Sequence, residues 1–418
     1  MARSGEPRRH HWVFWSAVVV LAVAVLVVGL SIARREVRAR RFQNSIAAFY
    51  EPPADFAAAA PGAILRIEPL GTEVPGGTGW RILYRSERTD GTPTVSSGML
   101  FVPAGAAPAE GRDVVAWAHG TVGLGTECAP SRTEDPLKAI AWVPGMLAAG
   151  FVVVATDYAG LGTPGVERYL IGRDEARDVI NSVRAARAVP EAGAGSRFAV
   201  YGHSQGGQSS LWTGTVAPVY APELSLVAIT AAAPAAELAP LVSLQQKTAI
   251  GWVIGPEVVV SWPLVYPELD PSTIVTKKAL RVGAGRGCIV EQALEGLVRT
   301  KLGQQYFAKD PSQQPQWRAA LDAQSPPPLP ASVPVLVGQG LKDDVVLPET
   351  TALLQQRWCA AGADLTMVWL GDLSHMAAGL TVGPLVSTWL QERFAGTPAS
   401  TNCGTLAPVA AAVVPPMP

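Results

Sequence analysis

Apolar segments typical of β-strands alternate with segments typical of helices over most of this chain, and this alternation constrains the fold more than any other feature. Runs such as 114–118 (VVAWA), 151–156 (FVVVAT) and 334–338 (PVLVG) are continuous and rich in β-branched residues. Runs of this kind suit strands that are buried on both faces of a parallel sheet. We therefore predict an α/β protein with a mostly parallel eight-stranded sheet and helices on both faces.

The positions of these elements follow from the pattern of apolar residues. Strands are expected at Trp80–Tyr84, Ser97–Val102, Val114–Ala118, Phe151–Thr156, Phe198–Tyr201, Leu226–Ala231, Val333–Gly338 and Leu365–Leu370. Helices are expected at Asp174–Val189, Gln205–Val216, Glu349–Ala361 and Met376–Phe394.

One long stretch, about 235–330, lacks this rhythm and instead carries long apolar segments and several prolines. Because it falls between late strands, we predict that it is a cap inserted over the carboxyl edge of the sheet. The main domain is then expected over 49–395. The Pro/Ala-rich segment 396–418 is predicted to be a loose tail.

Composition limits the kinds of partner. The chain has 33 basic and 34 acidic residues and a formal net charge of −1, so it lacks the basic field that nucleic-acid binding requires. No feature of the sequence implies a protein partner. The four cysteines form no C-x-x-C pair, which leaves zinc ribbons without support. They fit either two disulfides or four isolated thiols.

The amino-terminal region contains 21 residues without a charge, Trp12–Ile32. At about 1.5 Å per residue, a helix of this length spans the ~30 Å hydrocarbon core of a bilayer. We predict that residues 1–33 are a transmembrane anchor, contacting the membrane through residues 12–32. The alternative is an export signal cleaved near Ala33. Residues 34–48 are expected to form a basic juxtamembrane linker, either an amphipathic helix or a solvated segment.

A sharp turn that exposes a serine is predicted where one strand meets a helix. Gly202-His203-Ser204-Gln205-Gly206 matches G-x-S-x-G, follows a predicted strand and opens a predicted helix. The two glycines permit a turn too tight for Cβ atoms, which leaves the Ser204 hydroxyl at its apex as a nucleophile. The alternative is a structural glycine-rich turn.

A serine hydroxyl needs a base to accept its proton. Two of the five histidines precede the uncharged stretch, His203 lies inside the turn and is expected to point away from Ser204, and His119 ends a strand. His375 follows the last strand and precedes the last helix, which is the position of the base in this type of fold. We therefore predict that His375 is the base, with a structural loop histidine as the alternative.

The acid that orients this base is expected after the penultimate strand. Asp343 and Asp344 lie there, and because neighbouring side chains diverge, only one of them can face His375. We favour Asp343, with Asp344 as the second candidate and Asp372 as the third.

An oxyanion hole needs backbone N–H groups directed at the developing negative charge. Gln205, the residue after the nucleophile, is expected to supply one N–H. Thr121, in the loop after the strand that ends at His119, is expected to supply the other.

At this point the sequence resembles the secretory lipases of the α/β-hydrolase superfamily, a group that includes fungal lipase A-type enzymes. The resemblance rests on motifs spread from about Phe49 to Phe394. They are F-Y-E-P-P followed by P-G-A-I-L-R, H-G-T, C-A-P-S (128–131), D-Y-x-G-L-G (157–162), G-H-S-Q-G-G, K-D-D-V-V-L-P and C-A-A-G-A.

The resemblance implies a triad of Ser204, Asp343 and His375, a helical cap, and the disulfides Cys128–Cys288 and Cys359–Cys403.

Arginines after the uncharged stretch favour a cytoplasmic domain by the positive-inside rule, whereas the cysteines favour the outside. Because the family is typically exported, we predict a single-pass protein of the cell membrane with an extracytoplasmic catalytic domain, or a secreted protein.

The predicted function is hydrolysis of carboxylic esters of lipids by a serine hydrolase that needs no metal and no cofactor. An acyltransferase with the same triad is the first alternative, and a non-catalytic binding module of this fold is the second. Several apolar residues of the cap are expected either to line an acyl-chain pocket or to fill the cap's own core. They are Trp252, Val258–Val260, Trp262 and Tyr266.

Overall fold

The structure is a computed structural model that describes residues 8–282 and 287–417, with only part of the side chains in the first helix. It divides into two compact units, the first ending at Ala48 and the second beginning at Phe49.

The first unit is formed by helix α1 (Arg8–Tyr50). The helix runs without a break from the uncharged stretch into the arginine-rich segment 34–48. Across the described part of the chain, no helix combines the length and the apolar character that a bilayer span requires. The predicted single-pass localisation at the cell membrane is therefore wrong, and the predicted transmembrane anchor and membrane contact through residues 12–32 are not supported. The uncharged stretch is only one portion of a longer helix that is otherwise strongly basic.

The second unit is built on a sheet that has nine strands in the described residues, in the order β1-β2-β3-β5-β4-β6-β7-β8-β9. The strands are β1 (Ile64–Pro69), β2 (Gly77–Glu87), β3 (Pro93–Pro103), β4 (Arg112–Ala118), β5 (Val152–Thr156), β6 (Ala194–His203), β7 (Ser225–Ala232), β8 (Val335–Gly340) and β9 (Leu365–Leu370). Pairing is antiparallel from β1 to β5 and parallel from β5 across β4 to β9.

The predicted fold class is confirmed, but the sheet has one strand more than expected. The additional strand is β1, whose sequence ILRIEP mixes charged residues with apolar ones and ends in proline. Its residues are half-buried or exposed because it lies at the edge of the sheet. An edge strand of this kind lacks the continuous apolar run by which the other strands were recognised.

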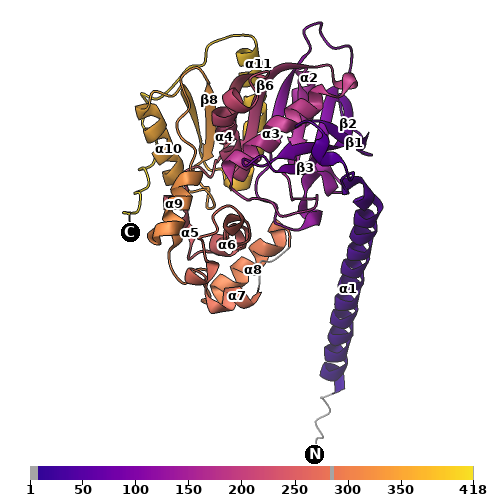
Figure 1. Cartoon of the computed structure of the whole chain (residues 1–418). Helices are drawn as coiled ribbons and strands as arrows, with labels where there is room; N and C mark the ends of the chain where they lie inside the picture. Colours follow the sequence, from indigo (N-terminus) through magenta and orange to yellow (C-terminus); the bar gives the residue numbers. More distant parts are fainter. Residues whose placement is uncertain (1–7, 283–286, 418) are drawn as a thin grey trace, which may run out of the picture. The chain divides into compact units, whose positions relative to one another are not determined.

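Helices cover both faces of the sheet (Figure 1). On one face α3 (Gly172–Arg187), α4 (Gln205–Tyr220) and α10 (Pro348–Ala360) share a buried apolar cluster with the strands. On the other face α2 (Val143–Ala148) and α11 (His375–Phe394) form a second cluster. This three-layer arrangement explains why the central strands are apolar on both faces.

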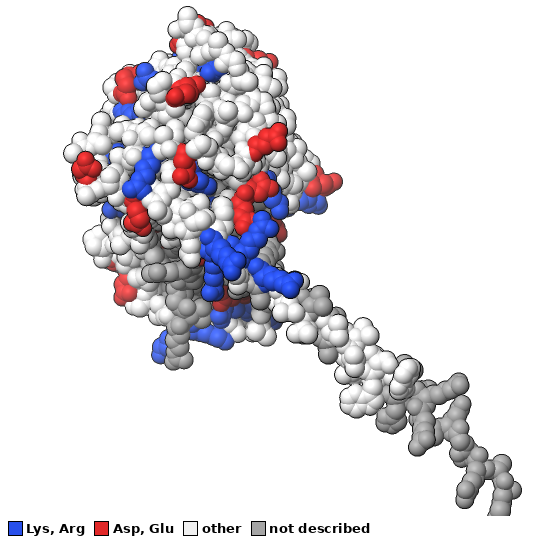
Figure 2. All heavy atoms as spheres, turned by 90° about the vertical axis from the view of Figure 1, so that its right-hand side faces the viewer, with Lys and Arg blue, Asp and Glu red and all other residues white. Residues whose placement is uncertain are grey.

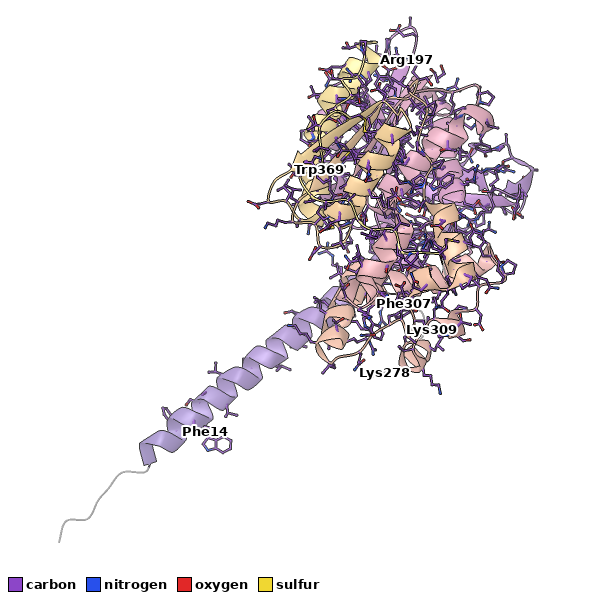
Figure 3. All side chains as sticks on the ribbon, turned by 90° about the vertical axis from the view of Figure 1, so that its left-hand side faces the viewer. Phe14, Arg197, Lys278, Phe307, Lys309 and Trp369 are labelled. Atoms are coloured by element: carbon purple, nitrogen blue, oxygen red, sulfur yellow. A yellow bond between two sulfur atoms is a disulfide. The ribbon has the colours of Figure 1, made fainter. Side chains whose placement is uncertain are left out.

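The segment between β7 and β8 forms a helical cap, seen together below the sheet in Figure 1. It contains α5 (Leu238–Gln245), α6 (Ala249–Ser261), α7 (Lys277–Val282), α8 (Ile289–Lys301) and α9 (Pro315–Gln324). Figure 3 labels Lys278, Phe307 and Lys309 in this cap and Arg197 and Trp369 on the sheet body.

The cap has a hydrophobic core of its own. Trp252 packs edge-on against Tyr306 with ring centroids 5.4 Å apart, and Trp262 stacks on Trp317 at 6.5 Å. Val258 is buried in the same cluster. These apolar residues of the cap therefore fill its core, which was the alternative to an acyl-chain pocket.

All four cysteines are paired in the way the family resemblance implied. Cys128–Cys288 joins the loop after β4 to the start of α8 in the cap. Cys359–Cys403 joins α10 to the carboxyl-terminal tail. The tail, expected to be loose, also contacts the body by hydrogen bonds. Asn402 bonds the backbone of Met367 in β9, and the Ala412 N–H donates to the Glu349 carbonyl at 2.8 Å.

Charged side chains are sparse on the face shown in Figure 2, where acidic and basic residues lie among broad uncharged areas. This distribution accords with a chain of which only 16% is charged and whose two signs nearly cancel. The candidate catalytic residues lie in the interior, at the carboxyl ends of the strands.

Candidate active site

Ser204 lies in the tight turn between β6 and α4. Its backbone has φ 59° and ψ −118°, a conformation that a residue with a side chain rarely adopts. The turn is held because the Ser204 N–H donates to the Ala232 carbonyl at 2.9 Å, while the Ser204 carbonyl accepts from the N–H groups of Gln208 and Ala235. A serine fixed at such a strand–turn–helix junction is in the geometry of a nucleophile elbow.

Close approach of the backbone explains the glycines around Ser204. A Cβ atom on Gly206 would lie 1.9 Å from the Ala118 carbonyl oxygen, and one on Gly202 would lie 2.0 Å from the Gly206 carbonyl oxygen. A Cβ on Gly120 would lie 3.3 Å from the Ser204 Cβ. The loop after β4 is thus packed directly against the serine turn.

His375 and Asp343 are brought together from the ends of two neighbouring strands. His375 is the first residue of α11, and its Nδ1–H donates to Asp343 Oδ2 at 2.8 Å. The other Asp343 oxygen accepts from the N–H groups of Val345 and Val346, both at 2.9 Å. Gln339 adds a hydrogen bond of 3.1 Å to Oδ2. The carboxylate is therefore surrounded by donors that fix its orientation.

The alternatives to Asp343 face solvent. Asp344 is exposed, and the Asp372 side chain is 95% exposed beside Lys342.

The described structure has no hydrogen bond between the Ser204 hydroxyl and His375. Catalytic hydrogen bonds in ligand-free enzymes are often longer than in the complex with substrate, so this geometry is compatible with a serine–histidine relay.

His203 contacts the candidate base, which the sequence did not indicate. Its ring lies 4.6 Å from the His375 ring, and its Nε2–H donates to the His375 carbonyl at 3.1 Å. Burial lowers the pKa of His203 to about 3, so this ring is neutral at physiological pH. The only signal for it in the sequence was its position next to Ser204.

The two residues predicted to form an oxyanion hole lie beside this turn. Gln205 is the first residue of α4, where backbone N–H groups have no partner within the helix. Thr121 follows Gly120, the residue packed against Ser204, and its hydroxyl hydrogen-bonds the Tyr169 hydroxyl at 2.9 Å. Both residues are thus placed near Ser204 by short backbone connections.

A group of buried carboxyl groups lies behind Gln205 and was missed in the sequence. The Gln205 side-chain amide donates to Glu167 at 2.6 Å and to Glu175 at 2.8 Å. Burial raises the pKa of Glu167 to about 8 and that of Glu175 well above its ordinary value. Glu257, in cap helix α6, also has its pKa raised to about 8, first by burial and then by the charge of Glu167. No motif marks these residues, because their grouping depends on the fold that brings Gln205 and the cap helix α6 to the segment 167–175.

The mixed sheet, the serine at a strand–turn–helix junction and the inserted helical cap define an α/β hydrolase. The family model described as Secretory lipase matches residues 138–278 and 320–402, and the chain belongs to this family. The predicted recognition is thereby confirmed, as is the class of enzyme, a carboxylic ester hydrolase.

Individual relatives are distant but cover most of the chain. Lipase 10 of Candida albicans is 24% identical over 398 residues, which cover 85% of this chain and 82% of the relative. The secreted triacylglycerol lipase LIP4 of Malassezia globosa is 26% identical over 351 residues, covering 78% and 74% of the two chains. Among solved structures, Candida antarctica lipase A superposes with a TM-score of 0.68 at 19% identity, covering 88% of this chain and 90% of that one.

Proposed function

We propose that this enzyme hydrolyses carboxylic esters of lipids through an acyl-enzyme formed on Ser204. The observation that supports this most strongly is the hydrogen bond from His375 Nδ1 to the buried Asp343 carboxylate, next to a serine held in a strained turn. Lipid esters are proposed because the family is described as Secretory lipase and a relative is described as a triacylglycerol lipase.

In the first step the Ser204 oxygen attacks the ester carbonyl carbon while His375 Nε2 accepts the serine proton. Asp343 holds Nδ1–H, so that Nε2 is the nitrogen free to act as the base, and its negative charge stabilises the imidazolium that forms. The ring of His203 packs against His375 and restricts its rotation.

The attack places a negative charge on the former carbonyl oxygen. The backbone N–H groups of Gln205 and Thr121 are proposed to bind this oxyanion, assisted by the positive end of the α4 dipole. Loss of one donor of this kind typically reduces kcat by about 10²–10³.

The tetrahedral intermediate then collapses. His375 donates its proton to the leaving alcohol, and the acyl group stays on Ser204 as an ester. A water molecule, deprotonated by His375, attacks this ester and releases the carboxylic acid, which restores the serine hydroxyl.

Acyl transfer to another alcohol shares the first half of this mechanism and differs only in the acceptor. A non-catalytic binding module is disfavoured because such a role needs neither the His375–Asp343 bond nor a strained Ser204. Product analysis distinguishes hydrolysis from acyl transfer, because hydrolysis releases the free acid and acyl transfer gives a new ester.

The test is hydrolysis of p-nitrophenyl esters with short to long acyl chains by the full chain, produced where disulfides form. We expect release of p-nitrophenol and free acid, abolished in Ser204→Ala and retained in Ser272→Ala, a control at an exposed serine of the cap. Formation of an ester product in the presence of an added alcohol, without free acid, would instead support the acyltransferase. No turnover by folded protein would contradict both.

A further inference from the structure

Two buried carboxyl groups converge on the side chain of the residue that follows the nucleophile. Glu167 Oε1 and Glu175 Oε1 both accept from the single amide nitrogen Gln205 Nε2, at 2.6 and 2.8 Å. The side chains of all three residues are almost completely buried, with exposures of 3%, 2% and 1% in the order Glu167, Glu175 and Gln205. The amide nitrogen carries two hydrogens and donates one hydrogen bond to each carboxyl group. The amide is thereby held from two sides.

The two carboxyl groups lie close together because both accept from the same nitrogen atom. They cannot both carry a negative charge there, because burial leaves no water to screen the repulsion. The hydrogen bonds indicate which one is neutral. Glu175 Oε1 also accepts from the Leu170 N–H at 2.8 Å, but Glu175 Oε2 is buried and has no partner in the described structure. An ionised carboxylate with an unpartnered oxygen would be costly, so Glu175 is the group that holds the proton.

The surrounding charges favour retention of this proton. Arg88 is a cation whose charge acts on Glu167, and its guanidinium donates to the backbone carbonyls of Ala159 and Val166. The other titratable groups that face the pair from neighbouring elements are acidic or phenolic, and they are Asp157, Asp178, Glu257, Tyr158 and Tyr169. The positive charge of Arg88 stands against several acidic groups, so a second negative charge on Glu167 and Glu175 is unfavourable.

The same short segment also contacts the second candidate donor and the cap. The Tyr169 hydroxyl, between the two glutamates in sequence, bonds the Thr121 hydroxyl at 2.9 Å. The Tyr169 carbonyl accepts from Trp262 Nε1 of the cap at 2.9 Å. Residues 167–175 therefore connect Gln205, Thr121 and the cap, and a displacement of this segment would disturb both donors together.

We propose that Glu167 and Glu175 are positioning residues that share one proton and hold Gln205, so that the oxyanion hole stays assembled only while that proton is bound. This inference rests on the proposed function, because it assigns the pair a role in the hydrolysis at Ser204. When the proton is lost, two negative charges face one amide, the segment moves, and the N–H groups of Gln205 and Thr121 lose their alignment. The pair then lowers kcat more than it changes KM, since the oxyanion forms only in the transition state.

The direction of the pKa shifts agrees with this geometry. Burial raises the pKa of Glu167 to about 8 and raises that of Glu175 well above its ordinary value, so the pair resists ionisation at neutral pH and ionises in the alkaline range. Activity is therefore expected to fall on the alkaline side as the pair ionises.

The test is the pH profile of kcat and KM with a short, soluble p-nitrophenyl ester, with the rate of Ser204→Ala subtracted at each pH. The wild-type chain is expected to lose at least ~10-fold in kcat across the alkaline limb, less than the about 10²–10³ for a removed oxyanion donor, because the donors are misaligned and not deleted. Glu175→Gln keeps the size and hydrogen bonds of the side chain but leaves one ionisable group, so its alkaline limb should disappear. Glu167→Gln should do the same, and Glu191→Gln, at an exposed carboxylate, should match wild type.

Labelling of Ser204 by a fluorophosphonate distinguishes failure of this inference from failure of the proposed function. If Ser204 is not labelled, the proposed function is wrong. If Ser204 is labelled but wild type shows no alkaline limb, or the folded Gln variants keep it unchanged, the shared-proton role is overturned. Glu175→Leu provides a second measurement: it is expected to reduce kcat by at least ~10-fold at every pH. Folded Glu175→Leu protein with wild-type kcat would also overturn the proposal.

Discussion

The two sides of the candidate site treat a buried carboxyl group in opposite ways. Asp343 accepts hydrogen bonds from two backbone N–H groups, from Gln339 and from His375, so both of its oxygens have partners. Glu175 is equally buried, yet one of its oxygens has no partner in the described structure. The first arrangement stabilises a negative charge and the second a neutral acid.

This contrast suits the two tasks. The histidine side needs a permanent negative charge opposite His375, because an imidazolium forms in each turnover. The oxyanion side needs a rigid support behind Gln205 that carries as little negative charge as possible, because each further charge there would oppose the oxyanion. The number of donors around each carboxyl group, rather than its burial alone, separates the two roles.

The largest expected effect breaks the histidine side. Asp343→Asn should reduce kcat by about 10⁴, because the amide cannot hold His375 in the tautomer that leaves Nε2 free. Asp344→Asn, one residue away at an exposed position, is the matched control and should leave kcat unchanged. Steady-state kinetics on both variants decides the choice of acid. A large loss in Asp344→Asn instead would assign the role to the other aspartate.

The turn that both sides share should be intolerant of a single methyl group. Gly206→Ala introduces a Cβ atom 1.9 Å from the Ala118 carbonyl oxygen, so β4 and α4 must separate. We expect a loss of ~2–3 kcal/mol in the free energy of unfolding, together with a large loss of activity. Gly145→Ala, where no atom lies within 4 Å, is the control and should leave both nearly unchanged. Urea denaturation that gave the same stability for both variants would argue against this packing.

The two disulfides close loops of different length and can be removed separately. Cys128–Cys288 closes a separation of 160 residues between the loop after β4 and the cap, and Cys359–Cys403 closes 44 residues between α10 and the carboxyl-terminal tail. The chain-entropy estimate makes loss of the longer loop more destabilising by ~1 kcal/mol. Double Cys→Ser variants at each pair, compared by urea denaturation, should show this order. The reverse order would mean that native contacts, and not loop length, set the difference.

The last expected effect concerns stability and pH. The pKa of Glu167 is raised from 4.5 to about 8 in the folded chain, so the folded state binds more protons than the unfolded state between these values. The contribution of Glu167 to stability is therefore fully present below pH 4.5 and is lost as pH rises through about 8. The free energy of unfolding of Glu167→Gln, measured by urea denaturation from pH 5 to pH 9, should fall less steeply than that of wild type. Parallel curves would contradict the assignment.

Much of the sheet and half of the site could be predicted because their residues carry local signals. The continuous apolar runs marked the buried strands, and Ser204, Asp343 and His375 could be chosen because each directly follows a strand. The edge strand β1 escaped because its residues are not continuously apolar. The apolar stretch of α1 was assigned to a membrane on length and charge alone, and the structure does not support that assignment.

The oxyanion side could not be predicted in the same way. Glu167, Glu175 and Glu257 read as ordinary surface residues in the sequence, and their role depends on burial and on convergence upon Gln205. The contact of His203 with His375 likewise depends on the packing of α11 against the serine turn. Such features arise from the tertiary fold and leave no periodic pattern in the chain.

The most direct test of the whole account is to trap the acyl-enzyme. The full chain would be mixed with a p-nitrophenyl ester, quenched with acid within the first turnover, digested and analysed by mass spectrometry. The account predicts an acyl group on Ser204 in wild type, and none on the corresponding peptide of Ser204→Ala. An acyl group on another residue, or one that persists in Ser204→Ala, would contradict it.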